Sequence, residues 1–129
     1  MRGRRRDRGA AVVEFALIVP VLLLLVLGIA EFGHAYQVQT SLSAAAREGV
    51  RVMALQNDPA AARDTTRASA PTLNLTNAQI SVSPGSCAAT STAPAATATV
   101  TVTYQMGFLT GLFGSGITLT GKGSMRCTG

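Results

Sequence analysis

The sequence predicts an α+β protein: a long N-terminal helix, first apolar and then amphipathic, followed by a small domain with one short helix and an antiparallel sheet of about three strands. Three observations predict this class. Residues 10–30 are almost entirely apolar. Across residues 31–55, apolar side chains recur at steps of three and four, as on one face of a helix. In residues 97–105, Thr and Val alternate with the period of two that is typical of a strand.

Positive charge is concentrated at the start of the chain. The first nine residues hold five arginines and one aspartate, a formal charge of +4, whereas the rest of the chain holds six basic and five acidic side chains. There is no second basic patch that could follow a phosphate backbone, so we do not expect a nucleic-acid partner. An arginine cluster directly before an apolar segment instead predicts a cytoplasmic N-terminus.

The apolar block, residues 10–30, is long enough to cross a membrane. As a helix, its 21 residues span roughly 30 Å, the thickness of a bilayer core. The block contains one charge, Glu14, and one proline, Pro20, which a membrane helix tolerates. We therefore expect a single-pass protein of the cytoplasmic membrane whose C-terminal part is extracytoplasmic.

Residues 31–57 extend this helix beyond the membrane. Within it, Ser41, Ala45 and Gly49 are spaced four apart and form a ridge of small side chains, over which a second helix can approach closely. The ridge fits two kinds of contact equally well: packing within one subunit, and packing between subunits.

Residues 58–129 are the predicted C-terminal domain. Turn residues and the alternation of apolar and polar side chains indicate where its helix, strands and loop lie. Asp58 and Pro59 fit the N-cap and first position of a helix ending near residue 70. Strands are expected over 78–83, 97–105 and 117–127, with a loop over 84–96. The connector 106–116 contains Phe108, Leu109, Leu112 and Phe113 among glycines. We expect these four residues to form a hydrophobic cap over the sheet; the alternative is an exposed edge facing a partner or the membrane.

The two cysteines, Cys87 and Cys127, both follow the apolar block. They have no CxxC spacing and no nearby cluster of histidine or carboxylate, so we expect no metal site. A disulfide between them is the natural interpretation if this part of the chain is exported, and two free thiols if it is not.

No catalytic constellation stands out in the sequence. The single histidine, His34, directly follows the apolar block, where an interfacial polar role is expected, and the serines have no GxSxG context. The glycines between residues 107 and 123 are interpreted as turns, because no phosphate-binding loop precedes a helix there. We therefore expect no enzyme activity, no catalytic residues, no cofactor and no small-molecule substrate.

The most informative motif lies at the start of the apolar block. Gly9 closes the cationic leader, residues 1–9, and Glu14 follows five positions later inside the apolar helix. A carboxylate in that position costs a few kcal/mol unless it is neutralised, so a partner is expected. If the chain is cut after Gly9, the new α-amino group of Ala10 lies one helical turn from Glu14 and can neutralise it, in the same chain or in a neighbour. The alternative is a hydrated Glu14 at the membrane surface.

Together these features resemble the N-terminal segment of the TadE-like family of pilus assembly proteins. The similarity covers residues 9–54, and it includes the glycine–glutamate pair, Phe15, Pro20, the Glu-Phe-Gly triplet at 31–33 and the Ala-Ala-Arg-Glu-Gly run at 45–49.

The resemblance implies a pseudopilin of the tight-adherence (Flp) pilus, a relative of type IV pili. In that family, a prepilin peptidase cuts after the leader glycine, which implies cleavage between Gly9 and Ala10, and Glu14 is the glutamate required for processing or assembly. Phe15 stands where the major pilin carries tyrosine, and the C-terminal domain is longer than in the major pilin, so a minor component is implied. The implied partners are the peptidase, other pilins or pseudopilins, and pilus assembly proteins.

The rival interpretation is a small secreted or membrane-anchored protein unrelated to pili. Gly28 and Ala30 place small residues where a signal peptidase requires them, so residues 1–30 fit a signal peptide cut before Glu31. Against this, the apolar block is longer than a usual signal and contains Glu14 and Pro20. The N-terminus of the mature protein distinguishes the cases: Ala10 for a pilin, Glu31 for a secreted protein, Met1 for an anchor.

Overall fold

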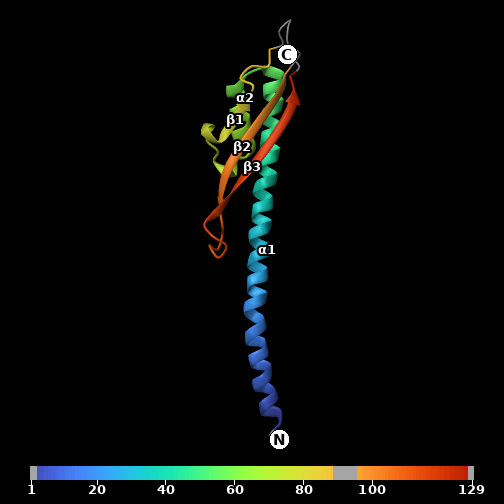
Figure 1. Cartoon of the computed structure of the whole chain (residues 1–129), viewed down its shortest axis with the longest axis vertical. Helices are drawn as coiled ribbons and strands as arrows, with labels where there is room; N and C mark the ends of the chain where they lie inside the picture. The colour runs from blue at the N-terminus through green and yellow to red at the C-terminus, as the bar shows by residue number, and fades with distance from the viewer. Residues whose placement is uncertain (1–2, 89–95, 128–129) are drawn as a thin grey trace. The chain divides into compact units, whose positions relative to one another are not determined.

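The computed structural model describes residues 3–88 and 96–127 and confirms the predicted α+β class (Figure 1). Residues 89–95 of the predicted loop and the first two residues of the leader lie outside this description. The chain forms two compact units, Met1–His34 and Ala35–Gly129, called here the N-terminal and C-terminal units. In order, the elements are α1 (Gly3–Gln56), α2 (Pro59–Ser69), the 3₁₀ turns η1 (Pro71–Leu73) and η2 (Asn77–Gln79), β1 (Ile80–Ser83), β2 (Thr97–Gly107) and β3 (Gly116–Arg126).

The break between the two α-helices is where the sequence predicts it. Asn57 ends α1 in the left-handed conformation with φ 53°, and its N–H donates to the Met53 carbonyl at 2.9 Å, as in a helix C-terminal cap. Asp58 then caps α2: its Oδ1 accepts from the N–H groups of Ala60 and Ala61 at 2.9 and 3.1 Å. Pro59 occupies the first turn of α2, where its missing N–H costs nothing.

The sheet has the order β1-β2-β3, and both pairings are antiparallel. The short strand β1 pairs only with residues 99–102 of β2. The hairpin of β2 and β3 is longer, since its pairing runs from Thr97 opposite Arg126 to Gly107 opposite Gly116. The half of the hairpin nearest the connecting loop therefore extends past β1 and is not covered by it.

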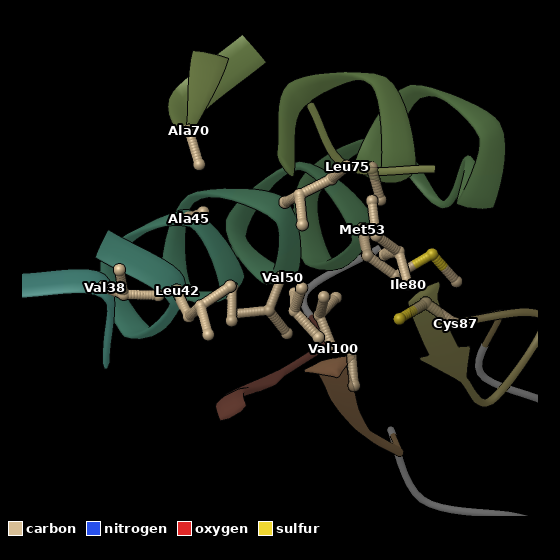
Figure 2. Packing of buried hydrophobic residues seen from close by; sticks show 14 of the residues in the cluster. Val38, Leu42, Ala45, Val50, Met53, Ala70, Leu75, Ile80, Cys87 and Val100 are labelled. Carbon is tan, nitrogen blue, oxygen red and sulfur yellow. The ribbon is translucent and has the colours of Figure 1, made fainter. Parts of the chain in front are cut away.

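The hydrophobic core lies between the C-terminal half of α1, α2 and one face of the sheet (Figure 2). Leu42 and Met53 from α1 are fully buried, as are Val100 and Val102, which alternate along β2. The core has many small side chains, so its elements pack closely. Its other buried apolar members are Val38, Ala45, Ala46, Val50, Ala62, Ala70, Leu75, Ile80, Cys87, Ala98, Met106 and Cys127.

Two glycines of β3 allow that strand to lie directly on α1. A Cβ added at Gly121 would come within 2.5 Å of the Leu42 backbone carbon, and one at Gly123 within 2.7 Å of the Ala46 carbonyl oxygen. Real Cβ atoms do not approach so closely, so only glycine fits at these positions. The interpretation of these glycines as turns was wrong: they lie inside a strand, where they are needed for contact with a helix.

The connector between β2 and β3 does not form the expected hydrophobic cap. Leu109, Leu112 and Phe113 are 63%, 60% and 53% exposed, and only Phe108 packs partly against the core. The physical reason is the length of the hairpin, which carries these residues past the end of β1.

Candidate functional site

The N-terminal unit presents a continuous apolar helix surface. Within the described residues, α1 is the helix whose length and composition suit a membrane span. Its large apolar side chains are exposed; Phe15 and Leu17, for example, are both 70% exposed. Leaving such a surface in water is unfavourable by about 25 cal/mol per Å² of apolar area, so it requires lipid or other apolar helices. The remaining exposed large side chains of this surface are Val12, Val13, Ile18, Val21, Leu22, Leu23, Leu24, Leu25, Val26, Ile29 and Phe32.

Gly9 lies within α1, where the fold makes no steric demand for glycine. A Cβ added at Gly9 meets no atom within 4 Å, in contrast to Gly49, Gly121 and Gly123, where it would collide with neighbouring atoms. Glycine inside a helix is also less favourable than alanine by about 0.5–1 kcal/mol. The fold therefore does not explain why glycine is present at this position.

Glu14 is exposed on α1, one helical turn after Ala10. No ion pair joins its carboxylate to another side chain in the described part of the chain. Pro20 follows inside the same helix. The helix already begins at Gly3, because the arginines of the leader are good helix formers and no cap or proline delays its start.

The small-residue ridge packs within the subunit over part of its length. Gly49 faces α2: a Cβ there would lie 1.9 Å from Thr66 Oγ1 and 3.1 Å from the Ala62 carbonyl oxygen. Ala45 is fully buried in the core. Ser41 is half-buried, and its Oγ donates to the Gln37 carbonyl at 3.0 Å. Ala45 and Gly49 thus pack within one subunit in the structure.

Cys87 and Cys127 form a disulfide in the structure, with their Cα atoms 5.5 Å apart. Both residues are buried. The bond joins the segment after β1 to the residue that follows β3, 40 residues later in the sequence. Two further contacts hold this end of the domain together: the Asn57 side-chain oxygen accepts from the Cys87 N–H, and the Cys127 N–H donates to the Ala96 carbonyl at 2.8 Å.

The other polar groups of the described residues do not converge on one site. No cluster of His, Cys, Asp and Glu there could hold a metal ion. The ion pairs Glu48–Arg51 and Asp64–Arg67 are exposed and join neighbouring turns of a helix, where such pairs contribute little. An open hollow at the loop end of the β2–β3 hairpin is lined only by uncharged residues: Gln105, Met106, Gly107, Ser115, Gly116, Ile117 and Thr118.

Comparison with known proteins gives one match. A family model described as TadE-like protein matches residues 9–51, a third of the chain. The search of curated proteins and the search of solved structures found no match. The match supports a pilin-like role associated with the tight-adherence pilus, and together with the apolar helix it fits a single-pass membrane protein. Residues 9–51 of this chain are thus similar to the TadE-like family.

Proposed function

We propose that this protein is a minor pseudopilin that takes part in assembly of a tight-adherence (Flp) pilus and is cut by a prepilin peptidase between Gly9 and Ala10. The observation that carries the proposal is the extent of the TadE-like match, which begins at Gly9 and includes Glu14 and the apolar helix surface. Gly9 is compatible with the cleavage step, because the fold makes no steric demand of its own for glycine there.

Cleavage changes the charge of the helix in two ways. It removes the arginine-rich leader, and it creates an α-amino group at Ala10. Glu14 lies four positions after Ala10 in the helix, a rise of about 6 Å along the axis. An acid inside an apolar helix costs about 2.5–3.5 kcal/mol at the membrane centre, so its neutralisation favours insertion. The amine that neutralises Glu14 belongs to the same chain or to a neighbouring pilin, and in the second case it sets the register between helices.

The proposed topology follows the charge of the leader. Residues 1–9 stay in the cytoplasm, residues 10–30 cross the cytoplasmic membrane, and residues 31–129 are extracytoplasmic. An oxidising compartment outside the membrane suits the Cys87–Cys127 disulfide. The partners are the peptidase, other pilins or pseudopilins, and pilus assembly proteins, and the protein acts through helix packing and not through catalysis.

A substitution at Gly9 tests this function. Gly9→Leu places a bulky side chain before the proposed cleavage site, and we expect the precursor to accumulate at full length and piliation to fall. Gly33→Leu is the matched control, since Gly33 is also a glycine of α1 with no atom within 4 Å of an added Cβ. Normal maturation and normal piliation of the Gly9→Leu variant would contradict the proposal.

A further inference from the structure

The loop end of the β2–β3 hairpin is an exposed apolar surface. We call residues 108–113 the hairpin tip; Leu109, Leu112 and Phe113 in it are each more than half exposed. The surrounding sequence has no charge, because no Asp, Glu, Lys or Arg lies between Arg67 and Lys122. Clustered exposed apolar residues of this kind indicate a contact surface and not ordinary solvent exposure.

The direction of the hairpin within the C-terminal unit follows from its contacts with α1. Gly121 lies against Leu42, and Gly123 lies against Ala46. Two strand residues advance about 6.6 Å, and four helix residues advance about 6 Å, so β3 and this part of α1 run side by side in the same direction. A hydrogen bond of 2.7 Å from Gln39 Nε2 to the Thr120 carbonyl continues the same alignment.

This alignment places the hairpin tip at the end of the C-terminal unit that contains Ala35. Gly116, where β3 begins, lies roughly 16 Å before Gly121 along the strand. Ala35, where the C-terminal unit begins, lies only about 10 Å before Leu42 along the helix. The tip therefore reaches past the start of the unit, at the end where the chain enters from the apolar segment; Figure 1 shows the turn of the hairpin at this end of the unit.

We propose that the hairpin tip inserts into the outer headgroup layer of the bilayer that residues 10–30 cross. This inference rests on the proposed topology. Ala35 follows the last apolar-block residue, Ala30, by five residues, so it lies within about 18 Å of the membrane boundary whatever the angle between the units. Tyr36, 68% exposed at the same end, is a residue type enriched at membrane interfaces.

The chemistry of the tip suits a lipid surface. Leucine and phenylalanine are the side chains with which interfacial segments enter the boundary between headgroups and acyl chains. Gly111 and Gly114, with φ of 69° and 111°, allow the tight turn that projects these side chains outward. With both the apolar helix and the tip in contact with the bilayer, the protein is attached to the membrane at two points.

Tryptophan fluorescence tests this placement, since the natural chain contains no tryptophan. Three single-tryptophan variants of the full chain, Phe113→Trp, Leu24→Trp and Leu55→Trp, are reconstituted in phosphatidylcholine vesicles with or without bromine on the acyl chains. Leu24 lies in the apolar block, and Leu55 is 56% exposed at the opposite end of the C-terminal unit. Brominated lipid should quench Leu24→Trp most, Phe113→Trp clearly, and Leu55→Trp least.

The three positions distinguish a hairpin tip that does not contact lipid from a chain that does not span the membrane. If Leu24→Trp is quenched but Phe113→Trp is quenched no more than Leu55→Trp, the hairpin tip does not contact lipid and the inference is overturned. A blue-shifted but unquenched Phe113→Trp would overturn it too, because the tip would then be buried against protein. If Leu24→Trp itself is unquenched, the membrane-spanning topology fails, and the inference fails with it.

Discussion

Replacing Gly121 by alanine tests the packing of β3 on α1 most severely. The added Cβ would lie 2.5 Å from the Leu42 backbone carbon and 2.6 Å from its carbonyl oxygen, whereas ordinary contacts begin at 3.4 Å. Because both atoms belong to the helix backbone, they cannot rotate away. The strand must move by about 0.9 Å, and Gly123, which faces Ala46 two residues later, moves with it.

The expected loss of stability follows from two opposing terms. Overpacking a close contact costs about 1–3 kcal/mol, and we expect the upper part of that range because the contacted atoms are rigid. Replacing glycine by alanine also restricts the unfolded chain, which offsets about 0.4–1 kcal/mol. The net cost is about 2 kcal/mol, which lowers Tm by about 8–16 °C for a domain of this size.

Thermal unfolding of the full chain in detergent micelles measures this change. Near-ultraviolet circular dichroism follows Tyr104, which lies in β2 and packs against the core. Gly107→Ala in the same hairpin is the control, since the nearest atom to its added Cβ is 3.9 Å away, at the Ser115 carbonyl oxygen. A Gly121→Ala protein that unfolds at the temperature of the wild type or of this control would refute the proposed contact.

Three further sets of substitutions test the disulfide, the N-cap of α2 and the role of Glu14. Replacing Cys87 and Cys127 by serine removes a cross-link over 40 residues, and it should lower the free energy of unfolding of the C-terminal unit by about 4 kcal/mol in urea denaturation. Asp58→Ala removes the N-cap of α2, which should cost about 1 kcal/mol in the same assay. Glu14→Gln keeps the size of the side chain but removes its charge; it should leave that stability unchanged and reduce the yield of sheared pili.

Each of these predictions has a matched control. A reducing agent added to the wild type should reproduce the effect of the double serine variant, and equal stability with and without the cysteines would exclude a stabilising disulfide. Asp64→Ala removes an exposed carboxylate of α2 and its exposed ion pair with Arg67, which contributes little, so it should cost less than Asp58→Ala. Glu48→Gln should not affect piliation, because Glu48 is exposed outside the apolar block; pili unaffected by Glu14→Gln would argue against a role for Glu14.

Local signals in the sequence were sufficient to predict the two α-helices and the three strands of the fold, but not the 3₁₀ turns η1 and η2. The Asp58–Pro59 pair fixed the start of α2, since its capping chemistry acts over three residues. The alternation of Thr and Val likewise located β2, whose buried positions fall on every second residue over Ala98–Val102. These features depend on neighbouring residues, so they can be recognised without knowing the tertiary structure.

Contacts between distant segments were harder to predict. The role of Gly121 and Gly123 was missed, although two glycines at alternate positions of one strand indicate a close approach of another backbone on that face. The exposure of Leu112 and Phe113 was missed because it depends on how far β2 and β3 extend past β1. In the candidate site, the motif at Gly9 and Glu14 was visible in the sequence, but the packing of Gly49 against Thr66 required the structure.

The N-terminal residue of the mature protein is the decisive measurement for the proposed cleavage after Gly9. The protein is recovered from the membranes of cells that make the pilus, and its N-terminus is determined by mass spectrometry. Cleavage after Gly9 predicts a chain that begins at Ala10 and remains in the membrane fraction. A chain that retains Met1, or one that begins at Glu31 and is released from the membrane, would contradict the proposed function.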